Sequence, residues 1–395
     1  MRKSLDNALH AAIPEIVALR HEFHQHPEIR FEEHWTSDRI ARFLDENGIR
    51  HTRGHARGTG VVGYIEGDAP GKTVVLRADM DALPIAEETG LAYASLSPDR
   101  MHACGHDGHM AVLCAAAKAL AMHKAELHGS VRFVFQPAEE QAGGGRLIAA
   151  EGLLGGAHAA FALHGWPELN VGQVGLRAGC VMASADFFRI DVAGHGAHGA
   201  DPAAGVDPIV AAAHIVQALQ TIASRETNPW VPVVVTVGRL EAGTAANIIP
   251  DRACMEGTFR TLDPAVRNEI REAIDRIATN VAEGLRARAR TSFDDGGGYP
   301  PLITDAAMTT FAREVIVRTL GESAAVDLPH PYMTAEDFAF YLEKVPGTFL
   351  FLGLSEPDRP SPALHTSHFD FNDHALLPGA LALSHLAAEI CGLGR

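Results

Sequence analysis

The sequence has 395 residues, of which 47% are hydrophobic and 21% charged. This length exceeds one ordinary hydrophobic core, so we expect two domains. The formal net charge of −16 excludes nucleic acid as an expected partner, because an acidic surface repels phosphate. We expect neither a signal peptide nor membrane association, because the apolar runs are too short to cross a bilayer.

The five cysteines are an odd number and lie far apart in the sequence. This pattern does not match a disulfide framework. We therefore expect a protein of a reducing, cytoplasmic setting.

The first part of the chain alternates between helical and strand-like patterns. Helical periodicity covers residues 6–26, 33–48, 108–123 and 145–153, and apolar runs typical of strands cover 61–65, 73–78, 131–135 and 159–163. Such alternation predicts an α/β domain in which helices flank a mainly parallel sheet.

A different order follows. Strands are predicted at 187–192, 231–240, 253–262 and 287–293, with helices at 207–224 and 264–285. This β-α-β-β-α-β order is ferredoxin-like. A linker at 294–301 and a helix at 304–320 come next. We therefore expect residues 1–183 and 298–395 to form a catalytic, metal-binding domain, with 184–297 inserted as a smaller α+β domain.

Polar side chains follow several predicted strands, where open α/β sheets bind ligands. Asp79 and Asp81 come just after one strand, although alone they fit a solvated turn. Cys104 and His106 flank Gly105, whose backbone freedom lets a thiolate and an imidazole face one ion. The alternative for this segment is a buried cysteine beside a helix-capping Asp107.

Further candidate donors lie later in the chain. Glu139 and Glu140 can divide the tasks of binding a metal and taking a proton from water. His164 ends an apolar run, and spacing alone does not rank His365 over His368. Mixed sulfur, nitrogen and oxygen donors in this number favour a pair of ions over a closed structural zinc site.

Four motifs in this order resemble a known family: Arg77–Pro84, Met101–His109, Gln136–Glu140 and Leu364–Asp373. They are similar to the hippurate hydrolase branch of the metal-dependent aminoacylase and carboxypeptidase family, which includes plant hydrolases of indoleacetyl–amino acids. The resemblance runs from Leu19 to Asp373, nearly the whole chain. It implies two divalent ions per subunit, with Mn, Zn, Ni or Co all suited to such donors.

The resemblance also implies roles for individual residues. Glu139 would be the general base, and Asp81 would orient a ligating imidazole. His106 would bridge the two ions, and the family position selects His365 over His368. The implied ligands are Cys104, His106, Glu140, His164 and His365.

For the inserted domain, the resemblance implies a lid that mediates dimerisation, and hence a homodimer or higher homo-oligomer. His198 would stabilise the oxyanion that forms on the scissile carbonyl. Asn247 and Arg260 would hold the substrate carboxylate, a task that suits a guanidinium. For Arg260, an ordinary surface arginine of a strand is an equal alternative.

Three residues depart from the family pattern. Ala203 and Ser367 replace a common histidine and a common proline, and Thr334 stands where glycine is usual. None of these is an implied ligand, so they bear on substrate preference.

The predicted function is metal-dependent hydrolysis of the amide bond of a small N-acyl amino acid, such as hippurate or an N-acetyl amino acid. The alternatives are a dipeptidase or aminopeptidase on the same scaffold, a non-catalytic ligand-binding protein, and a zinc-structured domain.

Overall fold

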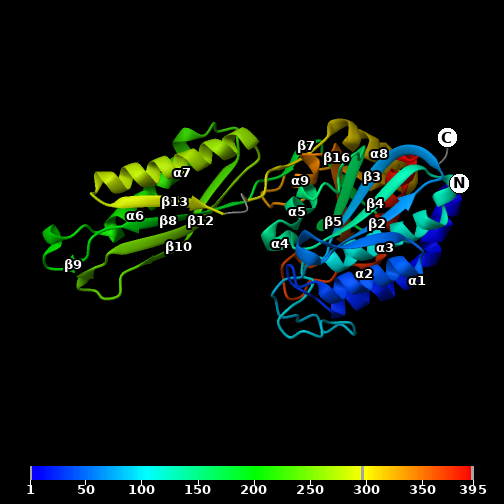
Figure 1. The fold of residues 1–395 in the computed structure, drawn as a ribbon, viewed down its shortest axis with the longest axis horizontal. Coiled ribbons are helices and arrows are strands. Elements are labelled where there is room, and N and C mark those ends of the chain that lie inside the picture. Colours follow the sequence, from blue (N-terminus) through cyan, green and yellow to red (C-terminus); the bar gives the residue numbers. More distant parts are fainter. Residues whose placement is uncertain (1, 295–297, 393–395) are drawn as a thin grey trace. The chain divides into compact units, whose positions relative to one another are not determined.

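The structure is a computed structural model that describes residues 2–294 and 298–392. The chain forms two compact units (Figure 1). Unit 1 comprises residues 1–179, 303–330 and 337–395, and unit 2 comprises 180–302 and 331–336. The chain passes between the units within two short strands, β7 (Gly179–Met182) and β14 (Leu302–Thr304), and again at either end of 331–336. The predicted linker 294–301 includes residues 295–297, which lie outside the described residues.

Unit 1 is built on an eight-stranded sheet. Its central pairs β4–β3, β3–β5 and β5–β16 are parallel, whereas β1–β2, β2–β4 and β16–β6 are antiparallel. In sheet order the strands are β1 (Arg50–His55), β2 (Gly60–Glu66), β4 (His128–Gln136), β3 (Ala69–Asp79), β5 (Ala159–Asn170), β16 (Gly347–Ser355), β6 (Val174–Leu176) and β15 (Ala325–Asp327).

Helices cover both faces of this sheet, because alternate strand residues are apolar on each side. On one face Leu76, Phe133 and Phe161 join the core of the long helices. On the other face Phe349 contacts Phe351 edge to face and lies beside Phe338, which precedes α9. The helices of unit 1 are α1 (Arg2–Gln25), α2 (His34–Glu46), α3 (His106–Met122), α4 (Glu139–Ala142), α5 (Gly144–Ala150), α8 (Ala306–Leu320), α9 (Ala339–Leu342) and α10 (Leu376–Ile390).

Unit 2 has its own core and the predicted β-α-β-β-α-β order. Its antiparallel sheet has the order β10 (Val233–Ala242), β12 (Arg252–Thr261), β8 (Asp186–Ala193) and β13 (Arg288–Phe293). Two helices, α6 (Pro208–Thr221) and α7 (Pro264–Gly284), bury their apolar faces on one side of it. An aspartate caps the N-terminus of each, Asp207 and Asp263, and a proline follows it. A short ribbon pairs β9 (Ala197–His198) with β11 (Ile248–Ile249).

The expected α/β class, with helices flanking the sheet, is confirmed, and several details differ. The sheet is parallel only at its centre and at the β15–β6 pair. Helix α3 begins at His106, two residues before the predicted start. Glu139 and Glu140 open a short helix, α4. Residues 331–336 pack with unit 2, where the Ala183 N–H donates to the Tyr332 carbonyl.

Candidate metal centre

The sheet of unit 1 brings the predicted donors to one edge. Parallel strands β3 and β4 end level with each other, since Asp79 pairs with Gln136. The register of β3 with β5 pairs Arg77 with Ala162. Asp79 and His164, two residues further along each strand, therefore lie level with each other as well. Residues that follow these strand ends therefore share one site, as expected for ligands of an open α/β sheet.

Five side chains from four segments of the chain converge there. The Cys104 sulfur lies 3.3 Å from Nε2 of His164 and 3.3 Å from Nε2 of His365. Nε2 of His365 is also 3.1 Å from Oε1 of Glu140, which lies 3.9 Å from Nε2 of His106. Ligands about 2.0–2.3 Å from a common ion are about 3–4 Å apart. The spacing of these donors therefore fits shared metal ions.

His106 gives a direct test of that fit. It is fully buried, and neither ring nitrogen has a hydrogen-bond partner within the described chain. Burial lowers the pKa of His106, but Asp79, Asp81 and Glu140 outweigh burial and raise this pKa to about 10. Buried polar atoms rarely stay unpaired. The site thus carries excess negative charge and unused donor atoms, which suits divalent cations.

The tautomer of His164 also suits a ligand. Its Nδ1 lies 2.8 Å from the Gly165 carbonyl, which can only accept, so Nδ1 carries the proton. Burial and the neighbouring His109 hold the pKa of His164 well below its usual range. The ring is therefore neutral, and the lone pair of Nε2 faces the sulfur of Cys104.

His109 and Asp79 lie beside the donors but have other partners. The Gly165 N–H donates to Nε2 of His109, so the proton sits on Nδ1 and points to Asp79, 2.7 Å away. Asp79 also accepts from Arg77 at 2.7 Å. Both nitrogens of His109 are thereby used, and we assign this residue a supporting place. Sequence reasoning named both residues without a role, because the Gly165 partner comes from a distant segment.

Asp81 contacts the segment that bears both glutamates. Its two carboxylate oxygens accept the backbone N–H groups of Glu139 and Glu140 at 2.9 and 3.0 Å. The same carboxylate lies 3.5 Å from Nδ1 of His106. Asp81 is therefore placed to orient the buried Glu139, the half-buried Glu140 and the His106 ring together.

The conformation of the C-terminal loop distinguishes the two candidate ligands His365 and His368. His365 adopts a left-handed backbone conformation with φ 63°, and its N–H donates to the Ala103 carbonyl. This turn brings the imidazole to Cys104. Both side chains are exposed, His365 to 51%, but His368 lies beside Ser367 and Glu88 instead of beside the donors.

His198, Asn247 and Arg260 belong to unit 2 and are described within it. The Ala200 N–H donates to Nδ1 of His198 at 3.0 Å, so the proton of a neutral ring sits on Nε2. Asn247 is close in the same ribbon, where its carbonyl accepts the Gly199 N–H. Arg260, on β12, is half-buried, and burial lowers its pKa. Its Nη1 lies 3.4 Å from the Met333 carbonyl.

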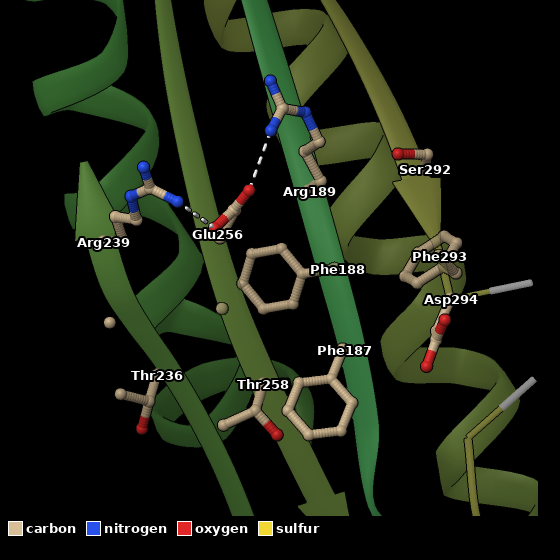
Figure 2. Close-up of a pocket in the computed structure, with 12 residues that line it drawn as sticks. Phe187, Phe188, Arg189, Thr236, Arg239, Glu256, Thr258, Ser292, Phe293 and Asp294 are labelled. Atoms are coloured by element: carbon tan, nitrogen blue, oxygen red, sulfur yellow. Dashed lines mark hydrogen bonds and ion pairs between the residues drawn. The ribbon is translucent and has the colours of Figure 1, made fainter. Parts of the chain in front are cut away.

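Unit 2 also has a hollow of about 590 Å³ on the open face of its sheet. Figure 2 shows Arg189 and Arg239 both directed at Glu256, at 2.7 and 3.2 Å, and Phe187 beside Thr258. Arg189 also forms an ion pair with Asp191, and Arg239 with Glu241. The residues lining the hollow include none of those predicted from the sequence.

The chain belongs to Peptidase family M20/M25/M40, which it matches over residues 75–389. It is 38% identical to an N-acetylcysteine deacetylase of Bacillus subtilis over 98% of both chains. It is also 38% identical to an indoleacetyl–amino acid hydrolase (ILR1-like 4) of Arabidopsis thaliana, over 95% of this chain and 85% of the plant protein. The predicted family and the prediction of an amidohydrolase-type enzyme are thereby confirmed.

Two solved structures share the fold. A putative aminohydrolase of methicillin-resistant Staphylococcus aureus has a TM-score of 0.93 and 31% identity, covering 99% of this chain and 100% of its own. A Bacillus subtilis protein described as a dinuclear metal-binding peptidase of the M20 family has a TM-score of 0.84 and 36% identity, covering 97% and 99%. Among the described residues, no helix combines the length and apolarity needed to cross a membrane.

Proposed function

We propose that this protein hydrolyses the amide bond of N-acyl amino acids with two divalent metal ions, releasing a carboxylic acid and a free amino acid. The observation that carries the proposal is the convergence of five donors, of which Cys104, His106 and His164 are buried, directly beside Glu139. A purely structural zinc site needs no carboxylate base next to its ligands. N-acetyl amino acids and hippurate are the substrates we propose to test first.

Cys104, His106, Glu140, His164 and His365 would hold the ions. Bound metal would polarise the scissile carbonyl and make a nearby water more acidic. The carboxylate of Glu139 then takes a proton from the attacking water. As the C–O bond forms and the C–N bond breaks, Glu139 returns that proton to the leaving nitrogen. Asp81 holds Glu139 in position by accepting the backbone N–H of Glu139.

Three residues of unit 2 complete the proposal. His198 would donate from Nε2 to the developing oxyanion. Its contact with the Ala200 N–H favours the tautomer that carries the proton on Nε2. Arg260 and Asn247 would bind the substrate carboxylate, for which a guanidinium provides paired donors. Ala203, Thr334 and Ser367 stay candidates for tuning substrate preference.

A substrate panel tests the reaction class. Metal-loaded protein should cleave hippurate or N-acetyl amino acids with a kcat/KM at least about tenfold above that for dipeptides, because the two groups differ by a charged amine. A preference for dipeptides would favour the dipeptidase alternative. Inertness on the whole panel would favour a non-catalytic protein.

Glu139→Gln tests the assigned base. The amide is close in size to the carboxylate but cannot take a proton, so kcat should fall by about 10²–10⁴-fold while two metals stay bound. The matched control is Glu343→Gln on the exposed surface of the same unit, which should keep full activity. Near-normal turnover by metal-loaded Glu139→Gln would show that the assignment is wrong.

The proposal includes a cytoplasmic setting and a homodimer formed through unit 2. The five cysteines form no disulfide with one another, which fits a reducing compartment. Among the residues that the structure describes, seven of the ten exposed large hydrophobic residues lie in unit 2: Phe187, Ile209, Val210, Trp230, Val234, Leu240 and Ile248. Exposed apolar groups gathered in one unit support association there.

A further inference from the structure

A carboxyl group that the proposed reaction does not use lies under the site. Glu33, the residue before α2, is fully buried. Its Oε1 accepts the backbone N–H of Ala138 at 3.0 Å, and its Oε2 accepts from the Thr59 hydroxyl at 2.8 Å. The N-terminal region thus reaches directly into the loop between β4 and α4.

Ala138 occupies an unusual position in that loop. It is a non-glycine residue in the left-handed region, with φ 57° and ψ 46°. Such a conformation is unfavourable for alanine and persists only where surrounding contacts hold it. Ala138 directly precedes Glu139, so its backbone angles set the direction in which α4 begins.

Two buried carboxyl groups divide the N–H groups of this turn. Glu33 accepts from residue 138, and Asp81 accepts from residues 139 and 140. The first N–H groups of a helix have no partner inside the helix. Three consecutive N–H groups are therefore fixed from outside the helix, those of the two glutamates by Asp81.

The chemistry of Glu33 differs from that of Asp81. Burial, together with the nearby Asp81 carboxylate, raises the pKa of Glu33 to about 8. A neutral carboxyl group still accepts a hydrogen bond through its carbonyl oxygen, and it adds no second negative charge beside Asp81. An uncharged acceptor of the same shape should therefore serve equally well at this position.

We propose that Glu33 is a positioning residue for amide hydrolysis: by accepting the Ala138 N–H it holds the left-handed turn that aims Glu139. This inference rests on the proposed function, in which Glu139 is the base. Glu33 touches neither substrate nor reacting atoms, so it acts only through the backbone of Ala138. It should consequently affect kcat and leave KM almost unchanged.

Three substitutions separate this role from a general effect on stability. Glu33→Gln keeps an acceptor for Ala138 and can donate its amide to Thr59. Glu33→Ala removes the acceptor, and Glu33→Asp keeps the carboxyl group but shortens its reach. The matched control is Glu28→Ala, because Glu28 accepts the N–H groups of Trp35 and Thr36 at the start of α2.

The expected result is a split between these variants. With metal-loaded enzyme and N-acetyl amino acids, Glu33→Ala and Glu33→Asp should lower kcat about 10- to 100-fold at a KM within about twofold, since a misplaced base loses much of its effect. Glu33→Gln should stay within about threefold of the wild type, and Glu28→Ala within about twofold, because neither loses the Ala138 contact. Two bound metals are expected throughout.

Three results would overturn the proposal. Normal kcat in both Glu33→Ala and Glu33→Asp would show that the contact is dispensable. An equal loss in Glu33→Gln, or in Glu28→Ala, would show that charge or stability, not the acceptor, matters. If Glu33→Ala fails to fold, the comparison of Glu33→Asp with Glu33→Gln still shows whether the acceptor for the Ala138 N–H is needed.

Hydrogen exchange separates this inference from the proposed function. Amide exchange in the segment 136–142 should accelerate at least about tenfold in Glu33→Ala but not in Glu33→Gln, because the Ala138 N–H loses its acceptor. If the wild type cleaves no member of the substrate panel, the proposed function fails, and exchange alone tests the positioning of the turn. Unchanged exchange in Glu33→Ala would overturn the positioning role itself.

Discussion

His106 and His109 lie one helical turn apart at the start of α3, yet their surroundings differ. His106 has unpaired nitrogens facing carboxylates, whereas His109 is held by Asp79 and by the Gly165 N–H. Gly165 directly follows His164, one of the proposed ligands. His109 therefore supports the metal site by fixing the backbone beside His164, as polar groups around metal ligands commonly do.

His109→Gln tests that support. The amide cannot reproduce both contacts of the imidazole, so metal affinity should fall about 10- to 100-fold, as for other groups that orient ligands. Titration against a competing chelator measures this change. His123→Gln, at the other end of α3, is the control, since His123 bonds to Ala119 and Ser4. Equal affinities in both variants would contradict the assignment.

His24 provides a pH-dependent contribution to stability. Burial lowers its pKa, but hydrogen bonds to Asp107 and Glu87 outweigh burial and raise this pKa to about 9. The protonated ring is therefore favoured by folding. Its stabilisation is complete below pH 6.5, the unfolded value, and disappears as the pH rises through about 9.

Urea unfolding of metal-free protein at pH 6 and pH 9.5 checks this contribution. The wild type should lose on the order of a few kcal/mol more than His24→Gln between these two pH values, since one pKa unit is about 1.4 kcal/mol. The difference between the two proteins removes the effect of other titrating groups. Parallel pH dependence in the two proteins would mean that His24 contributes nothing.

At the scale of elements, α3 packs unusually closely against the C-terminal loop. A Cβ at Gly108 would lie 2.4 Å from ring atoms of the fully buried Phe371. Gly108 therefore lets Phe371 contact the helix backbone between His106 and His109. The first turn of α3, which carries these histidines, depends on that contact.

Gly108→Ala should destabilise the protein by about 2–3 kcal/mol, because the buried ring must move. The free energy of unfolding in urea measures the loss. The control is Gly284→Ala at the end of α7, where no atom lies within 4 Å of the added Cβ. That change should be neutral or slightly stabilising, since alanine favours a helix. Equal effects would show that the Phe371 contact is not tight.

The elements also show how much of the structure can be predicted from the sequence. Periodicity located most helices and strands, and motifs named the five donors that the structure brings together. Glu139 and Glu140 were expected at a strand end, but the left-handed turn at Ala138 starts α4 there. That turn depends on Glu33, about 100 residues earlier in the chain, and no local pattern encodes such a contact. The tautomer of His109 was hidden for the same reason, because its partners Asp79 and Gly165 come from distant segments.

At the scale of the whole molecule, the two units have separate hydrophobic cores. The metal donors lie in unit 1, so unit 2 needs no metal to bury its helices against its sheet. The exposed apolar residues gather instead in unit 2, on α6 and on the edge strand β10. An exposed edge strand has unpaired backbone groups that favour pairing with another chain.

The oligomeric state tests the proposed association through unit 2. Sedimentation at several concentrations should give a molar mass about twice the 42.1 kDa of the chain. Val210 and Val234 are 44% and 40% exposed on α6 and β10. Changing both to glutamate should raise the dimer dissociation constant at least about 100-fold, since association would bury unpaired charges.

Leu96→Glu is the matched control, because Leu96 is an equally apolar residue, 70% exposed, in unit 1. It should leave the dimer intact. A wild type that sediments as a monomer at every concentration would contradict the association. A double variant that stays dimeric would move the interface away from α6 and β10. Because the exposed side chains tolerate charge in the monomer, the variant should keep its fold, and its circular dichroism spectrum checks this point.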